Sequence, residues 1–153
     1  MTAKPHYTIR PAVLADAAAL RLREADAREL AAMGLPAVPT LAAAVAQSYE
    51  AWAAVDRRGR PMALWGLTTS SFVSRDASLW LFTGRQVVKL QWSFVSHARK
   101  YIDNCRRRFS TLDIFVHDEY KQACRLYRLL GFKDYAAVDL NGNTFLRMRQ
   151  YGY

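Results

Sequence analysis

Cysteine is scarce in this sequence, and its scarcity excludes several kinds of protein. The two cysteines, Cys105 and Cys124, lie in segments with helical spacing and have no CxxC motif or histidine cluster beside them. A disulfide framework or a metal site would need such groupings, so neither is expected. Both thiols are expected to be small buried hydrophobic side chains in a reducing cytoplasm.

Long uninterrupted apolar runs are also missing. Arg, Asp or Gln interrupts each apolar stretch before it reaches the roughly 20 residues that a membrane-spanning helix needs. The opening stretch MTAKPHYTIR contains no hydrophobic signal region. We therefore expect no membrane span and no secretion, and we expect residues 1–153 to form one soluble domain.

Acidic residues are outnumbered, with 13 Asp and Glu against 22 Lys and Arg, which gives a formal net charge of +9. Such a protein attracts anions, but nucleic acid, an acidic protein surface and a phosphorylated cofactor would all satisfy that attraction. The dense basic run, Arg106 to Arg108, lies where a helix is expected to end, and cations there also favour the helix dipole. A basic nucleic-acid-associated protein is therefore one alternative, without a zinc-finger or RNP-type motif to support it.

The apolar patterns that are present predict an α/β fold with a mixed, mostly antiparallel central sheet flanked by helices. Spacings of two predict strands, and spacings of three and four predict helices. Asp16 is expected to be the N-cap of the first helix. In chain order, the predicted elements are a strand at 7–10, helices from 16 and from 40, a hairpin at 51–69, a strand at 77–82, a helix at 91–105, a strand at 112–116, a helix at 120–130 and a hairpin at 134–150.

The segment LDIFVHDEYKQACRLYRLLGF, residues 112–132, contains the clearest candidate for chemistry. Its first part alternates as a strand, and its second part has one apolar helical face that includes Ala123, Cys124 and Tyr127. Gly131 suits the left-handed residue that follows a helix. The spacing of Tyr127 is that of a buried face, so the residue is predicted to be at least a core aromatic.

This order of elements, together with two motifs, resembles the GCN5-related N-acetyltransferases. IRPAVLADAAAL is similar to the opening strand and helix of that family, and ACRLYRLLGF is similar to its late A..LY...GF signature. The resemblance implies the acetyltransferase fold, with acetyl coenzyme A as the cofactor of an active member. It also implies that Tyr127 is a catalytic acid, because a phenol of pKa about 10 can protonate a leaving thiolate whose conjugate acid has a pKa near 8.5. The resemblance places Glu24 and Asp26 beside the acceptor groove, where they are either amine-binding acids or solvated helix charges.

The sequence departs from this family at the expected cofactor junction. The family joins its fourth strand to the next helix by a Q/R-x-x-G-x-G/A loop whose backbone amides hold the pyrophosphate. Here the junction reads FTGRQVVKLQW, with Gly84 placed early and with Val87 and Val88 where small residues are needed. If coenzyme A binds, Gly84, Arg85 and Lys89 are the candidate contacts. We expect acetyl coenzyme A to bind weakly or not at all, so that no cofactor is used.

A narrower resemblance implies a structural role. LREADARELAAMGLPAVPTLAAAVAQS and LWLFTGRQV are similar to a group of small tailed-phage proteins related to internal virion protein A of T7-like phages. This resemblance implies a virion or morphogenesis protein in the host cytoplasm during assembly, or in the virion. Its partners would be portal, internal-core or head proteins, with DNA nearby. An active acetyl coenzyme A-dependent N-acetyltransferase is the alternative.

The C-terminal residues provide the candidate docking surface for such partners. Arg147, Arg149, Tyr151 and Tyr153 belong to a basic, aromatic terminus with no obvious packing partner. Residues of these types contribute strongly to interfaces, whereas a fraying terminus is the alternative. Deleting residues 150–153 is accordingly expected to leave the melting temperature almost unchanged.

Overall fold

A seven-stranded sheet with the strand order β1-β2-β3-β4-β5-β7-β6 organises the protein. The structure is a computed structural model that describes residues 7–153, without the side chains of residues 88–91. Along the chain, the elements are β1 (Tyr7–Pro11), α1 (Leu14–Ala19), α2 (Glu24–Ala32), α3 (Ala37–Gln47), β2 (Glu50–Asp56), β3 (Pro61–Thr69), β4 (Asp76–Thr83), the 3₁₀ helix η1 (Arg85–Leu90), α4 (Gln91–Arg108), β5 (Thr111–His117), α5 (Lys121–Leu129), β6 (Lys133–Leu140) and β7 (Asn143–Tyr151).

Five of the six strand pairings are antiparallel, and the exception joins the two halves of the sheet. β4 and β5 are parallel, with Asp76 opposite Thr111 and Leu79 opposite Ile114. The long helix α4 lies between them in the chain. The parallel pair makes the sheet mixed and mostly antiparallel, which confirms the predicted sheet type.

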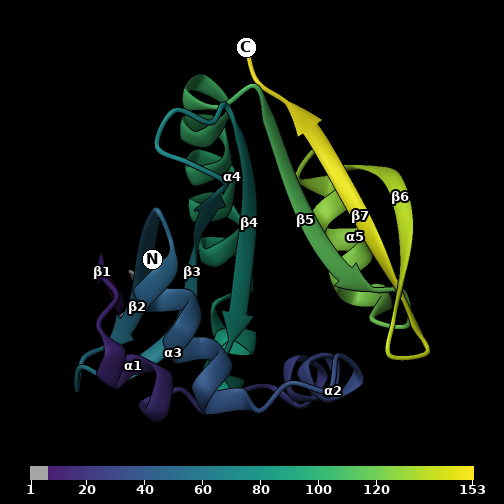
Figure 1. The fold of residues 1–153 in the computed structure, drawn as a ribbon. Coiled ribbons are helices and arrows are strands. Elements are labelled where there is room, and N and C mark those ends of the chain that lie inside the picture. The colour runs from purple at the N-terminus through teal and green to yellow at the C-terminus, as the bar shows by residue number, and fades with distance from the viewer. Residues whose placement is uncertain (1–6) are drawn as a thin grey trace.

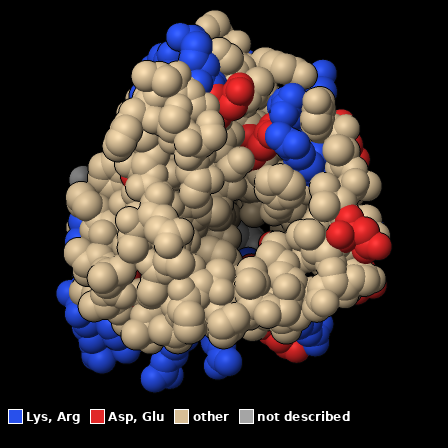
Figure 2. All heavy atoms as spheres, viewed as in Figure 1, with Lys and Arg blue, Asp and Glu red and all other residues tan. Residues whose placement is uncertain are grey.

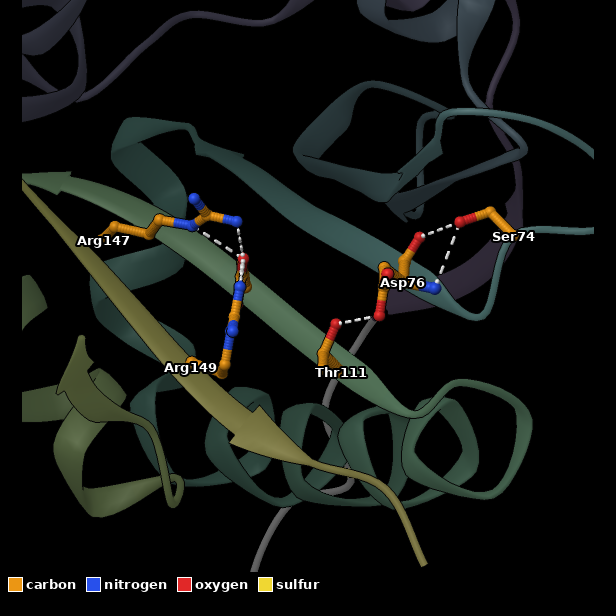
Figure 3. Close-up of polar contacts among 6 residues, drawn as sticks. Ser74, Asp76, Thr111, Arg147 and Arg149 are labelled. Carbon is orange, nitrogen blue, oxygen red and sulfur yellow. Dashed lines mark hydrogen bonds and ion pairs between the residues drawn. The ribbon is translucent and has the colours of Figure 1, made fainter. Parts of the chain in front are cut away.

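The pairing of β4 with β5 ends early, so the sheet opens into a V. No register partner across this pair follows Leu79 or Ile114, although β4 continues to Thr83 and β5 continues to His117. Figure 1 shows the two strands diverging from their paired ends, with α2 lying at the open end. At the closed end, the Thr111 hydroxyl donates to Asp76 Oδ1 at 2.6 Å, and Asp76 also bonds Ser74 (Figure 3).

Helices cover both faces of the sheet. α1 and α3 pack on one face over a cluster that includes Leu41, Ala53 and Leu64. α4 and α5 lie on the other face, over a cluster that includes Leu112 and Ile114 (Figure 1). Along the strands, alternating side chains reach opposite faces, which is why β-strand alternation in the sequence predicted these elements.

The first helix begins earlier than expected. Val13 is its N-cap, and Asp16 lies inside the first turn. The Asp16 carboxylate accepts the Val13 amide at 2.8 Å and pairs with Arg10 at 2.7 Å. The expectation that Asp16 is the N-cap was wrong, because its carboxylate reaches back to the cap residue from the third helical position.

The C-terminal residues are part of the sheet, which corrects the expectation of a tail without packing partners. Arg147 and Arg149 lie on β7, between β5 and β6. Both reach toward β5 (Figure 3), where they donate to the buried Asp113 carboxylate at 2.8 and 2.7 Å. Tyr151 pairs with Thr111 at the end of β7.

The residues after β7 are also anchored. The Tyr153 ring lies 4.3 Å from the Arg106 guanidinium, and the Tyr153 amide donates to the Arg106 carbonyl at 3.0 Å. Because these groups have partners within the fold, their chemistry no longer supports a free docking element.

Among the described residues, no single helix has the length and apolar composition of a membrane span, and only the pair α2 and α3, bent by 87° at its break, would satisfy those criteria together.

Candidate active site

α2 bridges the open end of the V through two carboxylates. Asp26 accepts the amide and the hydroxyl of Thr83 at the end of β4, the hydroxyl at 2.6 Å. Glu29 accepts the amide of His117 at the end of β5, at 3.2 Å. Residues three apart share one face of a helix. Asp26 and Glu29 thus bind one strand end each and hold the two strands apart.

The environment of these carboxylates disfavours their charged forms. Burial raises the pKa of Asp26, although hydrogen bonds from Thr83 oppose that rise. Burial also raises the pKa of Glu29 to about 7, and the nearby Asp26 charge adds to it against the hydrogen bond from His117. Glu29 can therefore exchange a proton near neutral pH, as a general base must.

Tyr127 lies on the buried face of α5, as its spacing predicted. Its ring is 8% exposed and meets Phe132 edge-on, with 6.3 Å between ring centroids. Burial raises the pKa of its hydroxyl well above the ordinary value, and the charges of Glu29 and Asp26 raise it further. No hydrogen-bond partner for this hydroxyl is found in the described part of the chain. The ring is a core group, while the role of the hydroxyl as an acid stays a prediction.

A groove of about 340 Å³ runs along the V beside these residues. We call it the wedge groove, and it is lined by Thr83, Val87, Phe94, Tyr120, Leu126 and Tyr127, among others. Arg23 and Arg125 also border it and give it positive charge. Figure 2 shows the surface hollowed between the part that carries β4 and the part that carries β5.

At the junction, the backbone amides of the predicted cofactor contacts Gly84 and Arg85 bond within the protein, whereas those of a phosphate-binding loop are free to bind phosphate. The Gly84 amide donates to the Met62 carbonyl at 2.7 Å, and the Arg85 amide donates to the Arg21 carbonyl at 3.0 Å. A Cβ at Gly84 would lie 2.9 Å from the Met62 carbonyl oxygen, so close backbone packing explains this glycine. The Arg85 side chain is exposed, and the Lys89 side chain lies outside the described residues.

Val87, which stands where the family loop would need a small residue, has its side chain buried in the core. It is 5% exposed and packs with Ala54, Met62 and Ala63 in the core, forming part of the groove wall. Within the described part of the chain, no three His, Cys, Asp or Glu side chains are grouped as metal ligands would be.

The sequence singled out Asp26 but missed Glu29. Glu24, proposed with Asp26, is exposed and pairs with Arg28 on the outer face of α2. The signal for Glu29 was its spacing: it follows Asp26 by three residues and adjoins Leu30, which is buried. The spacing places both carboxylates on the inner face, but only the fold brings them to the strand ends.

Comparisons with known proteins identify the fold. The sequence matches no family model and no curated protein. Among solved structures, it is similar to Ard1 from Thermoplasma volcanium, with 14% identity, a TM-score of 0.73 and coverage of 97% of this chain and 99% of that one. A putative phosphinothricin N-acetyltransferase matches with 14% identity, a TM-score of 0.71 and coverage of 96% and 99%.

A third similar structure is a spermidine N-acetyltransferase from Vibrio cholerae in complex with coenzyme A and spermine. It matches with 12% identity, a TM-score of 0.70 and coverage of 95% of each chain. At these identities the likeness concerns the fold, and it confirms the predicted fold of the GCN5-related N-acetyltransferases.

The comparisons contradict the expected role in phage head or internal-core assembly. These similar structures are acetyltransferases that match almost the whole chain. They connect it with no virion protein. The expectation that the protein is no enzyme has no support in them either.

Proposed function

We propose that this protein transfers an acyl group from a coenzyme A thioester to an amine within the V between β4 and β5. One observation carries the proposal. The Tyr127 hydroxyl, which has no hydrogen-bond partner in the described part of the chain, lines a groove where the charge of Glu29 influences it. A proton donor thus lines the groove together with Asp26, and the carboxylate of Glu29, which does not itself line the groove, lies on the same face of α2 as Asp26.

The residues of the V fit coenzyme A in part. Beyond Leu79 and Ile114, β4 and β5 turn unpaired edges toward each other, and such edges can hydrogen-bond the amides of an extended ligand. Arg23 and Arg125 border the groove and suit a phosphorylated ligand. The Gly84 amide is already bonded, so these side chains would replace a glycine-rich phosphate nest. When bound, the cofactor would supply an activated acyl thioester.

Two groups of the protein would handle the protons. Above its pKa of about 7, Glu29 is a carboxylate that can accept the proton of an amine. Tyr127 keeps its proton because burial raises the pKa of its hydroxyl. Tyr127 would therefore be the proton donor of the reaction. Asp26 fixes the end of β4 through its hydrogen bond with Thr83.

The acceptor is proposed to be a primary amine. Asp26 and Glu29 place carboxyl oxygens at the open end of the V, and above its pKa of about 7 Glu29 adds a negative charge that suits a cation. One similar structure holds spermine. The Vibrio cholerae protein is named for spermidine, and the acceptor of this chain is proposed only at the level of a primary amine.

Thiol release from acetyl coenzyme A, measured with a panel of primary amines, would test the proposal. Turnover should fall by about 100-fold or more in Tyr127→Phe, because proton transfer by a positioned side chain contributes on that scale. Tyr49→Phe is the matched control, since Tyr49 is exposed and lies against Phe109, outside the groove. Absence of thiol release with every amine, together with no binding of coenzyme A in calorimetry, would contradict the proposal.

A further inference from the structure

A second and larger hollow lies between α4 and the sheet. Its volume is about 570 Å³. We call it the α4 cavity, and its walls include Trp52, Trp65, Leu79, Val95, Ala98 and Ile102. The hollow is partly open to solvent, as a groove that admits a ligand must be. Its volume lies within the range of sites that bind small organic molecules.

The α4 cavity is continuous with the wedge groove at Tyr127. Five residues line both hollows: Leu81, Phe94, Val95, Leu126 and Tyr127. The side chain that offers a free hydroxyl in the groove is therefore also a wall of the cavity. A group that reacts beside Tyr127 would have an apolar space open to its extension.

The composition of the walls indicates what can enter. Most of the lining is aliphatic or aromatic. The charged side chains at one end compensate each other, since Glu50 pairs with Arg108 at 2.6 Å and accepts the Trp52 indole N–H at 2.9 Å. A long apolar group would be sheltered along the walls, and this polar end would limit its length.

We propose that the α4 cavity binds the acyl group of the donor, and that this group is a medium-length apolar chain rather than acetyl. The inference rests on the proposed acyl transfer. An acetyl group has two carbons and would leave most of the hollow empty. Each buried methylene strengthens binding by about fourfold. An acyl chain of about eight to ten carbons should therefore bind far more tightly than an acetyl group.

Intrinsic fluorescence gives a direct test, because Trp52 and Trp65 line the cavity. The purified protein would be titrated with coenzyme A, acetyl coenzyme A and decanoyl coenzyme A. The decanoyl thioester should bind at least about 100-fold more tightly than the acetyl thioester and should change the tryptophan emission. This comparison uses the unaltered chain and needs no acceptor amine.

Two variants on α4 locate the effect. Ala98→Phe places a ring in the cavity and should weaken decanoyl coenzyme A binding at least tenfold, while acetyl coenzyme A binds as before. Ser96→Phe is the matched control, because Ser96 is exposed on the same helix and is absent from the lining. Melting curves would confirm that both variants fold.

The possible outcomes separate the two proposals. Equal binding of acetyl and decanoyl coenzyme A would overturn the acyl-pocket inference and leave acyl transfer standing. An undiminished preference for decanoyl in Ala98→Phe would also overturn it, because the chain would then lie elsewhere. Failure of coenzyme A and both thioesters to bind would overturn the proposed function itself. Tight binding of free decanoate alone would assign the cavity to a separate apolar ligand.

Discussion

Glu29→Gln should stabilise the protein in a pH-dependent way. Burial raises the pKa of Glu29 from 4.5 to about 7, which corresponds to roughly 3 kcal/mol at about 1.4 kcal/mol per pKa unit. Between these two pKa values, the folded protein holds a proton that the unfolded chain releases. Stability therefore falls as pH rises through this window, and the loss is complete above about pH 7.

Glutamine has the shape of protonated glutamate and can still accept the His117 amide, but it never becomes charged. Wild type and Glu29→Gln should thus have similar stability near pH 4, to within about 1 kcal/mol. By pH 8 the variant should be more stable by up to roughly 3 kcal/mol. For a chain of this size, that difference raises the melting temperature by about 6–12 °C.

Urea and thermal melts of both proteins, taken at intervals from pH 4 to pH 8, would measure the difference. Asp16 and Asp113 have lowered pKa values, which add a trend of opposite sign, but that trend is common to both proteins and cancels. Glu24→Gln, exposed on the same helix, is the control and should show little change. A difference between wild type and Glu29→Gln that does not vary with pH would refute the reasoning.

Three further changes test other parts of the structure. Deleting residues 150–153 should lower the melting temperature by several degrees, because Gln150 is buried in β7 and Tyr153 is anchored on Arg106; an unchanged melting temperature would restore the free-tail hypothesis. Asp113→Asn should destabilise the protein by about 2–4 kcal/mol in urea melts, since it removes the charge that two arginines share; a smaller effect would mean that solvent compensates them. Tyr127→Phe should keep the wild-type melting temperature to within about 2 °C, because its hydroxyl has no partner in the described residues to lose; a large loss would reveal a structural bond.

The parts of the fold that sequence predicted are those governed by local periodicity. The change of period after residue 82 marked β4 and α4, and the spacing of Tyr127 placed it on a buried face. The predicted hairpin at 134–150 turns at Asn141 and Gly142, a pair typical of tight hairpin turns, where both residues have positive φ angles.

The candidate site was less predictable because it depends on distant partners. The hydrogen bond between Glu29 and His117 joins residues 88 positions apart, and no local sequence pattern predicts it. Arg147 and Arg149 looked like surface cations because their partner, Asp113, belongs to another strand. From sequence, Val87 stood where a phosphate-binding loop needs a small residue, and only the fold shows that its side chain is buried against β2 and β3.

The strand order also constrains how the chain can fold while it is being synthesised. Among the described residues, β6 pairs with β7 alone, and β7 lies between β6 and β5 although it comes after both in the chain. Until residues 143–151 have left the ribosome, β6 has no neighbour and Asp113 has neither of its arginines. The residues of β1 to β4 are all synthesised before β5 emerges, so their pairings can form first. The half that completes the V can be finished only after β7 has been synthesised.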